Sequence, residues 1–465
     1  MSAPFSVADA LAWTGGRLIQ GDPQAVLAGV STDTREDLAG SLFVAIRGPQ
    51  HDAHAYLDQA AEAGAAALLV ERADAVPAGV AIPAIEVADT TVALGALGAG
   101  HRSGFGGPLV AITGSNGKTT TKEMCAAILA VRFATHKNRG NLNNAYGLPL
   151  TLLAREAEHE ALVVEIGMNH RGEIAPLAEI AAPTVGVITN VGTAHIEHLG
   201  DQDTIALEKG DLIAALSPDA VAIVNADDAR VMAQAQRTRA RVVSFGVAES
   251  ADVRATDIRD RVGSFDFTLV TPEGTRAVNV PGLGQPTVPN ALAASAAALA
   301  AGASLDDIAP GLAAFAPAAG RMGRAQTEDG TQIIDDTYNA NPHSMFEALE
   351  SLVRAAGSEP AVAVVGDMGE LGDRAEAAHR DTGRRAAELG VGAIIALGEF
   401  SDRVIAGATA VDTFTGRTHI ASDHEDAART ADAFAGPDGW ILVKGSRSMR
   451  MERVVEALTR SGDQA

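Results

Sequence analysis

The chain has 465 residues, with 36 Lys and Arg against 59 Asp and Glu, so its formal net charge at pH 7 is −23. Such an acidic chain lacks the basic face that general nucleic-acid binders and binders of anionic membranes need, although a local pocket can still take an anionic small ligand. Its 47% hydrophobic and 20% charged residues are typical of a globular protein, and at roughly 100–200 residues per domain the length corresponds to about three domains.

The single cysteine, Cys125, excludes an intramolecular disulfide, which fits a reducing compartment. No apolar run approaches the ~20 residues that span a bilayer. Residues 1–15 lack the basic and then apolar pattern of a secretory signal. We therefore expect a cytoplasmic protein that has no membrane insertion and no nucleic-acid partner.

Two stretches rich in Gly and Pro, at 98–108 and 314–320, indicate domain seams, because such clusters interrupt regular structure. We expect an N-terminal domain at 1–100, a central domain at 101–317 and a C-terminal domain at 318–465.

Short apolar runs alternate with helical patterns through the central and C-terminal segments, whereas the first segment carries mixed α/β signals. The central runs begin at Leu109, Leu162, Val185 and Val221, and the later ones begin at Val362, Ala393 and Ile441. Alternation of this kind predicts parallel sheets covered by helices, and thus the α/β class. The Ala-rich stretch 290–301 is typical of a tightly packed helix.

A glycine-rich turn, TGSNGKTTT at 113–121, directly follows the first central strand and precedes a helical pattern. Gly114 and Gly117 let backbone N–H groups approach phosphate oxygens, and a helix N-terminus adds positive potential. Lys118 would reach the β- and γ-phosphates, and the Thr119 hydroxyl would hold Mg²⁺. The pattern predicts ATP binding; the alternative is a glycine-rich turn with an incidental lysine.

Two candidate metal ligands follow neighbouring strands. Glu165 ends an apolar strand, where a carboxylate is costly unless it is paired or metal-bound, and His195 follows the next strand. Because the carboxyl ends of parallel strands meet at one edge of the sheet, both would lie near the phosphate loop. The alternatives are a salt bridge for Glu165 and a structural role for His195. Lys209, by its pattern alone, is typical of a solvated helix lysine.

Together with further motifs, these residues resemble the Mur ligases, the ATP-dependent amino-acid and peptide ligases of peptidoglycan synthesis. The resemblance covers nearly the whole chain and rests on TGSNGKT (113–119), GNLNN (140–144), EIGMNH (165–170), NVGTAH (190–195), DDTYNANP (335–342), GDMGELG (366–372) and KGSRS (444–448). The YNANP and KGSR runs are similar to those of the family member that joins D-alanyl-D-alanine to UDP-N-acetylmuramoyl-tripeptide.

The resemblance implies three domains: a mixed α/β domain that binds UDP, a central parallel-sheet P-loop ATPase domain and a C-terminal Rossmann-like domain. It also implies ATP and two Mg²⁺ ions. Thr119 and Glu165 would ligate one ion and His195 the other. Lys209 would be carbamylated, which turns a cation into an anionic ligand. The implied catalytic set is Lys118, Glu165, His195 and Lys209.

The resemblance also implies binding residues. Those for ATP are Gly114, Ser115, Asn116, Gly117, Lys118, Thr119, Thr120, Asn141, Asn290, Arg321 and Asp336. Those for the UDP substrate and the dipeptide are Thr34, Arg35, Arg47, Asn339 and Arg447. Two departures stand out: Pro286-Thr287 replaces a frequent His-Asn pair, and Thr34 replaces a serine.

The reaction implied is activation of a carboxylate as an acyl phosphate, followed by attack of an amine. A monomer is the default expectation. Three alternatives stay open: a sibling ligase that adds diaminopimelate or lysine, a folylpolyglutamate synthase, and a non-catalytic nucleotide-binding regulator.

Overall fold

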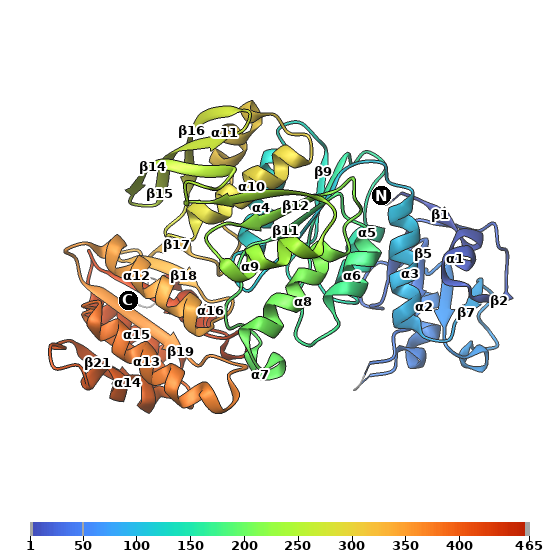
Figure 1. Cartoon of the computed structure of the whole chain (residues 1–465). Coiled ribbons are helices and arrows are strands. Elements are labelled where there is room, and N and C mark those ends of the chain that lie inside the picture. Colours follow the sequence, from blue (N-terminus) through green and yellow to red (C-terminus); the bar gives the residue numbers. More distant parts are fainter. Residues whose placement is uncertain (1–2, 49–50, 461–465) are drawn as a thin grey trace.

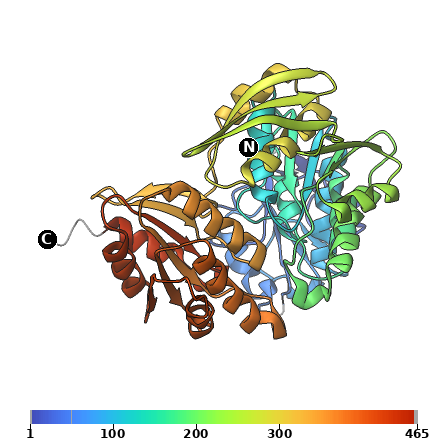
Figure 2. The ribbon, with the colours of Figure 1, turned by 60° about the vertical axis from the view of Figure 1, so that its left-hand side comes forward.

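The computed structural model describes residues 3–48 and 51–460. Its strands form sheets of five, nine and six members and one two-stranded ribbon within these ranges. The N-terminal domain and the C-terminal domain lie at opposite ends of the molecule, with the central domain between them (Figure 1). The turned view in Figure 2 shows the C-terminal domain beside the central one.

The N-terminal sheet has the order β2-β7-β6-β5-β4, and every neighbouring pair is parallel except β2 and β7. This confirms the mixed α/β expectation. Its elements are β1 Phe5–Ser6, α1 Val7–Thr14, β2 Arg17–Gln20, β3 Val26–Leu27, β4 Gly29–Ser31, β5 Ser41–Val44, α2 Leu57–Glu62, β6 Ala67–Val70, β7 Ala84–Glu86 and α3 Thr90–Ser103.

The central domain confirms the four expected strands and their parallel pairing. Its elements are β8 Leu109–Thr113, α4 Lys118–Leu129, β9 Thr135–Lys137, α5 Gly147–Leu153, β10 Ala161–Glu165, α6 Ile174–Ala181, β11 Val185–Ile188, α7 Ile196–Leu199, α8 Gln202–Ala214, β12 Val221–Asn225, α9 Ala229–Gln234, β13 Arg241–Gly246, β14 Val253–Arg261, β15 Ser264–Thr271, β16 Gly274–Pro281, α10 Thr287–Ala300 and α11 Leu305–Ala313.

The order of the central sheet is β16-β15-β14-β13-β12-β11-β8-β10-β9. β8 therefore lies between β10 and β11, so the loop that follows β8 emerges beside the ends of both neighbours. The sequence analysis did not foresee the antiparallel extension β14–β16.

Both faces of the parallel part are covered. Val110 and Ile112 of β8 belong to one apolar core, with α4, α10 and α11, while Leu109 and Ala111 belong to the core on the opposite face. Strands buried on both faces have nearly continuous apolar sequences, which is why these runs could be recognised. The Ala-rich helix α10 is almost wholly buried, as expected.

The C-terminal sheet has the order β17-β18-β22-β19-β20-β21 and is parallel except for β17 and β18, which confirms a Rossmann-like α/β arrangement. Its elements are β17 Gly323–Gln326, β18 Gln332–Asp336, α12 Pro342–Ala356, β19 Ala361–Gly366, α13 Ala375–Glu388, β20 Ala393–Leu397, α14 Ser401–Thr409, β21 Arg417–Ile420, α15 His424–Ala435, β22 Trp440–Lys444 and α16 Glu452–Arg460.

The first expected seam, 98–108, begins inside a packed helix. Residues 98–103 are the last turns of α3, and a Cβ at Gly98 would lie 2.9 Å from the Cα of Pro149 in α5. The buried Arg102 guanidinium donates hydrogen bonds to the carbonyls of Ala181 and Ala182, each 3.0 Å away. The glycine at this seam therefore permits close helix packing, and the N-terminal domain is fixed to the central one.

In the ranges 3–48 and 51–460, every helix is too short or too polar to cross a bilayer.

His101 is buried where α3 packs against the central domain. Its Nδ1 lies 3.0 Å from the carbonyl oxygen of Leu152, and its Nε2 lies 3.0 Å from that of Ala3. Burial lowers the pKa of His101, and the nearby Arg155 guanidinium lowers it further, although the two carbonyls oppose this. The native fold therefore favours the neutral imidazole more than the unfolded chain does.

We expect the contact between the N-terminal and central domains to weaken in acid. Since the pKa of His101 is lower in the folded state, its contribution to stability is complete above the ordinary histidine pKa of about 6.5 and is lost as the pH falls. His101→Gln should flatten the fall in Tm between about pH 7.5 and 5.5, and the exposed His51→Gln should retain the wild-type slope. An unchanged slope in His101→Gln would contradict this assignment.

Candidate functional site

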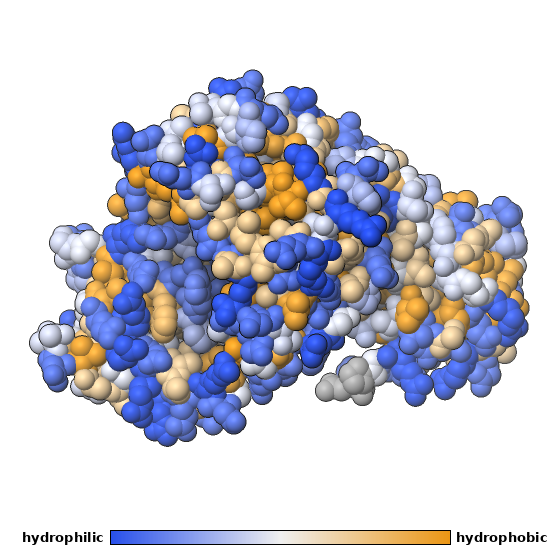
Figure 3. Space-filling view, in the orientation of Figure 1, coloured by the Kyte–Doolittle hydropathy of each residue, from blue (hydrophilic) through white to orange (hydrophobic). Residues whose placement is uncertain are grey.

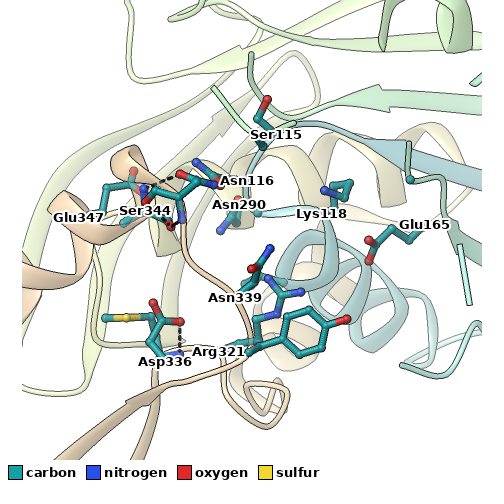
Figure 4. A pocket seen from close by; sticks show the side chains of 18 of the residues that line it. Ser115, Asn116, Lys118, Glu165, Asn290, Arg321, Asp336, Asn339, Ser344 and Glu347 are labelled. Carbon is teal, nitrogen blue, oxygen red and sulfur yellow. Dashed lines mark hydrogen bonds between the residues drawn. The ribbon is translucent and has the colours of Figure 1, made fainter. Parts of the chain in front are cut away.

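A cleft of about 430 Å³ lies between the central and C-terminal domains. Hydrophilic residues follow this boundary on the face shown in Figure 3. Figure 4 shows Lys118 and Glu165 on the central-domain side, opposite Arg321, Asp336 and Asn339. The cleft lining contains these predicted site residues: Ser115, Asn116, Gly117, Lys118, Thr120, Asn141, Glu165, His195, Lys209, Asn290, Arg321, Asp336, Asn339 and Arg447.

Three predicted substrate residues lie in the N-terminal domain and do not line this cleft: Thr34, Arg35 and Arg47. The exposed Arg35 side chain pairs with Asp33 across a tight turn, at 2.5 Å. The backbone of Arg47 forms an isolated antiparallel bridge with Asp52. The structure thus separates the predicted UDP contacts from the predicted ATP contacts.

The phosphate loop requires glycine at two positions. Gly114 and Gly117 have φ of +149° and +78°. A Cβ at Gly114 would lie 1.8 Å from the Thr189 hydroxyl oxygen, and a Cβ at Gly117 would lie 2.2 Å from Oδ1 of Asn290. Both conformation and space therefore exclude a larger residue. Directly after Gly117, α4 begins at Lys118, with its N-terminal N–H groups at the cleft.

The segment after β11 holds the phosphate loop in place. The carbonyl of Asn190 accepts a hydrogen bond from the Ser115 N–H at 3.0 Å, and its side-chain Oδ1 accepts one from the Asn116 N–H at 2.9 Å. The Gly192 N–H donates to the Ser115 hydroxyl at 2.8 Å. Asn190 therefore fixes the loop, a role that its place in the NVGTAH motif alone does not predict.

Asn290, at the start of α10, lies under the loop, where its Oδ1 accepts a 3.3 Å hydrogen bond from the Thr121 hydroxyl. Pro286 and Thr287, which stand where the family often has a His-Asn pair, have structural contacts. Pro286 precedes the first turn of α10. Thr287 packs against Gly282, where a Cβ would lie 2.4 Å from the Thr287 hydroxyl oxygen.

Glu165 is a buried carboxylate, only 3% exposed, and each of its two oxygens accepts one hydrogen bond. The Thr119 hydroxyl and the Asn143 amide each donate to it at 2.8 Å, and its own N–H donates to Oδ1 of Asn138 at 2.9 Å. Burial raises the pKa of Glu165, but the charge of Lys118 and the two side-chain hydrogen bonds outweigh it and lower the pKa. The carboxylate is therefore anionic and aimed at the cleft.

Asn143 is thus the residue of the GNLNN motif that contacts Glu165. Asn141, which the resemblance implies as a binding residue, lines the cleft, but in the described part of the chain its side chain makes no hydrogen bond to this carboxylate. The motif was the correct signal, but the sequence alone does not say which of its three asparagines faces inward.

Lys118 is held by its own loop, since its Nζ donates to the Gly114 carbonyl at 2.9 Å. Burial lowers the pKa of Lys118, the Glu165 carboxylate opposes this, and the Arg321 guanidinium adds to the lowering. A second cationic group, the Arg321 guanidinium, therefore faces the same space as the Lys118 ammonium, which makes this part of the cleft suited to a polyanion.

Lys209 is 2% exposed, so its interpretation as a solvated lysine is wrong. Burial, and then repulsion from Lys118, hold the pKa of Lys209 well below its usual range. The neighbouring carboxylate of Glu208 accepts from the backbone N–H groups of Gly172, Glu173 and Ile174 at 2.9–3.1 Å. Within the described ranges no hydrogen bond or ion pair holds the Lys209 Nζ.

His195 follows β11 and its Nδ1 lies 2.6 Å from Oε2 of Glu370, in the C-terminal domain. No three His, Cys, Asp or Glu side chains of the described chain gather into a group that could hold a metal by itself. Mg²⁺ is usually bound through one or two carboxylates together with substrate phosphates. The pairing of Glu165 with the Thr119 hydroxyl fits this pattern.

On the C-terminal wall of the cleft, two guanidiniums lie near the ring of Tyr338. The Cζ of Arg321 lies 4.0 Å from the centroid of the Tyr338 ring, and that of Arg447 lies 5.9 Å from it. Both distances are within the range of a cation–π contact. Tyr338 belongs to the DDTYNANP motif, but the motif alone does not predict that its ring contacts both guanidiniums.

Asp336 is bound on both carboxylate oxygens. The buried Lys444 donates to its Oδ2 at 2.5 Å, and the Met322 N–H donates to its Oδ1 at 3.2 Å. Lys444 also donates to the carbonyl of Asn339 at 2.8 Å. This buried lysine therefore fixes two predicted ligand contacts at once, and it was missing from the predicted set.

The C-terminal domain touches the phosphate loop directly. Asn341, which caps α12, donates from its amide to Oδ1 of Asn116 at 2.8 Å, and His343 lies 3.3 Å from the Asn116 amide nitrogen. The two walls of the cleft are therefore joined at the loop itself.

Comparisons with known proteins agree with this geometry. Two family models match the chain: "Mur ligase middle domain" over residues 112–298 and "Mur ligase, glutamate ligase domain" over residues 320–447. The chain is 38% identical, over 438 residues and 94% of each protein, to the UDP-N-acetylmuramoyl-tripeptide–D-alanyl-D-alanine ligase of Escherichia coli.

Solved structures give the same result. The fold is similar to MurF from Acinetobacter baumannii, with a TM-score of 0.89, 36% identity and coverage of 98% of this chain and 99% of that one. It is also similar to MurF ligase from Thermotoga maritima in complex with ADP, with a TM-score of 0.81, 28% identity and coverage of 92% and 96%.

We expect Gly117→Ala to lower the affinity for ADP at least tenfold, because the new methyl group would displace Asn290 and the loop. Gly15→Ala is the control, since Gly15 has a similar φ of +66° but open space around its Cβ position. Both variants should lose about 1 kcal/mol of stability from the left-handed backbone, and Gly117→Ala should lose more because its Cβ would lie 2.2 Å from Oδ1 of Asn290. Only Gly117→Ala should weaken ADP in calorimetry; equal ADP affinities in the two variants would contradict the steric argument.

Proposed function

The chain belongs to the Mur ligase family, and on this premise we propose that the cleft joins D-alanyl-D-alanine to UDP-N-acetylmuramoyl-tripeptide, with ATP as the energy source. The product is the UDP-N-acetylmuramoyl-pentapeptide used in peptidoglycan synthesis. The observation that carries the proposal is one cleft in which a phosphate loop, a buried carboxylate and two guanidiniums face each other. The 38% identity over 94% of the chain supports the substrate assignment.

The chemistry has two steps. A carboxylate oxygen of the tripeptide attacks the γ-phosphorus of ATP, the bond to ADP breaks, and an acyl phosphate forms. The amine of D-alanyl-D-alanine then attacks the acyl carbon, loses a proton and displaces inorganic phosphate. No covalent intermediate with the protein is needed, so the protein supplies positioning and charge stabilisation.

The phosphate loop would bind the ATP phosphates through its backbone N–H groups, from Gly114 to Thr120, and through the Lys118 ammonium. Asn290 would support the loop from below. Arg321 would reach the phosphates from the opposite wall, and Asp336, fixed by Lys444, would contact the ribose. The contact between Asn116 and Asn341 supports a closed arrangement in which both walls act on one nucleotide.

Two Mg²⁺ ions would be held by the donors already described. Glu165 and Thr119, with Asn141 nearby, would hold one ion, and His195 with carbamylated Lys209 would hold the other. The buried, anionic and hydrogen-bonded state of Glu165 supports the first assignment. Bound Mg²⁺ would neutralise charge on the triphosphate and on the carboxylate that attacks it.

Substrate recognition would be divided between the ends of the molecule. Thr34, Arg35 and Arg47 would bind the UDP moiety on the N-terminal domain, while Asn339 and Arg447 would bind the dipeptide in the cleft. A guanidinium matches a terminal carboxylate in shape and charge, which supports the choice of Arg447.

We place the domain boundaries at 1–100, 101–317 and 318–465. The gap between α11 and β17 supports the second boundary, whereas the first boundary falls within the last turn of α3, a few residues before the gap that precedes β8. The same proposal makes the protein a cytoplasmic monomer, since its substrates are soluble nucleotide-linked precursors and the cleft needs no second copy.

Phosphate release from ATP and Mg²⁺ tests the function. With UDP-N-acetylmuramoyl-tripeptide and D-alanyl-D-alanine together we expect sustained release, and omission of either substrate should reduce it to background. Release with a single amino acid, or with a dipeptide-stage acceptor, would assign the chain to a sibling reaction. ADP binding without any release would favour a non-catalytic role.

We further expect a carbamate on Lys209. Lys209 is buried, and no hydrogen bond or ion pair in the described ranges holds its amine, so the amine is readily neutral and can react with CO₂. NMR in the presence of ¹³C-bicarbonate should show a carbamate resonance that Lys209→Arg abolishes. Lys122→Arg is the matched control, because Lys122 is equally buried but its Nζ donates to the Asn138 carbonyl at 3.0 Å. A resonance that survives in Lys209→Arg would contradict this expectation.

A further inference from the structure

One polar contact bridges the cleft at its mouth. Glu370, in the GDMGELG segment after β19, accepts a hydrogen bond at 2.6 Å from Nδ1 of His195, in the segment after β11. The His195 side chain is 18% exposed and the Glu370 side chain 45% exposed. The carboxylate comes from the C-terminal domain and the imidazole from the central one, so the contact exists only while the two domains are docked.

The backbone is strained on both sides of this contact. Six non-glycine residues of the described chain have positive φ, and His195 at +62° and Glu370 at +59° are two of them. Such conformations are uncommon for residues with a side chain and persist where the surroundings over-determine them. Neither residue lies in a regular element that would impose this geometry. The strain therefore coincides with the place where the two side chains meet.

The hydrogen bond determines which nitrogen of His195 is available. A neutral imidazole has one N–H, and a carboxylate that accepts it at Nδ1 leaves the lone pair on Nε2. Metal-binding histidines commonly have this partner, because it fixes the tautomer and the ring orientation. His195 also lines the cleft.

We propose that Glu370 is a positioning residue that orients His195 as a ligand of the second Mg²⁺, so that docking of the C-terminal domain completes this metal site. The inference rests on the proposed function. It makes domain docking and binding of the second metal reciprocal: each favours the other by the same free energy. The first metal, on Glu165 and Thr119, does not depend on docking in this way.

Removal of Glu370 should leave the domains docked. The contact between Asn341 and Asn116 at 2.8 Å and the ion pair between Arg354 and Asp260 at 3.3 Å also join the C-terminal domain to the central one. A Glu370 variant should therefore lower the affinity for the second metal ion and leave the affinity for the nucleotide unchanged.

The test is a titration of the full chain with Mn²⁺ in the presence of β,γ-methylene-ATP. Electron paramagnetic resonance measures the free Mn²⁺ at each point of the titration. In Glu370→Ala we expect the weaker of two Mn²⁺ sites to lose about 10- to 100-fold in affinity. Glu370→Gln retains an oxygen acceptor and should lose clearly less. Glu376→Ala is the control, since Glu376 is an exposed carboxylate of the same domain that pairs with Arg403; it should bind Mn²⁺ as the wild type does.

Three results would be decisive. Two wild-type-like Mn²⁺ sites in Glu370→Ala would overturn the inference while leaving the proposed ligase intact. An equal loss in Glu370→Ala and Glu376→Ala would also overturn it, because the effect would then be general. A wild-type chain that binds a single Mn²⁺ would reject the two-metal proposal itself. Calorimetry with ADP should give unchanged affinity in all variants, which checks that the phosphate loop is intact.

Discussion

Burial of charge at the carboxyl edge of the central sheet is the constraint on which the rest of the site depends. Glu165 and Lys209 are buried there, and Lys118 is half-buried beside them. Lys118 and Glu165 each alter the ionisation of the other, and both act on Lys209. A buried charge is tolerated only with partners. Glu165 has them in Thr119 and Asn143, whereas no hydrogen bond or ion pair within residues 3–48 and 51–460 holds the Lys209 amine.

The same constraint explains why the loop around this edge is so closely packed. Water is excluded only if Thr189, Asn190 and Asn290 approach the phosphate loop closely, and this approach leaves no room for a Cβ at Gly114 or Gly117. The hydrogen bonds that brace the loop also orient its N–H groups before any nucleotide arrives. Such preorganisation lets a protein of net charge −23 present a local site for a polyanion.

Much of the fold followed from the sequence because parallel strands buried on both faces have continuous apolar runs, as in β8, β10 and β11. The alternating pattern of β14–β16 was less evident, since one face of that extension is exposed and charged. Site residues could be predicted where the residue type is unusual for its position, as for Lys118 in the glycine-rich turn and Glu165 at the end of an apolar strand. Sequence could not predict which asparagine of GNLNN faces Glu165, that Lys209 is buried, or that Glu370 meets His195, because these depend on loop conformation and on contacts between domains.

The packing of α3 has a consequence for how the two ends of the molecule work together. Arg102 and His101 bury their side chains against the central domain, so the N-terminal domain has no free hinge there. If the nucleotide end of the acceptor is anchored on that domain, the distance to the reacting carboxyl group is constant. The molecule then discriminates among acceptors by length: a peptide stem one residue too short fails to reach the phosphate loop, however well its sugar and nucleotide bind.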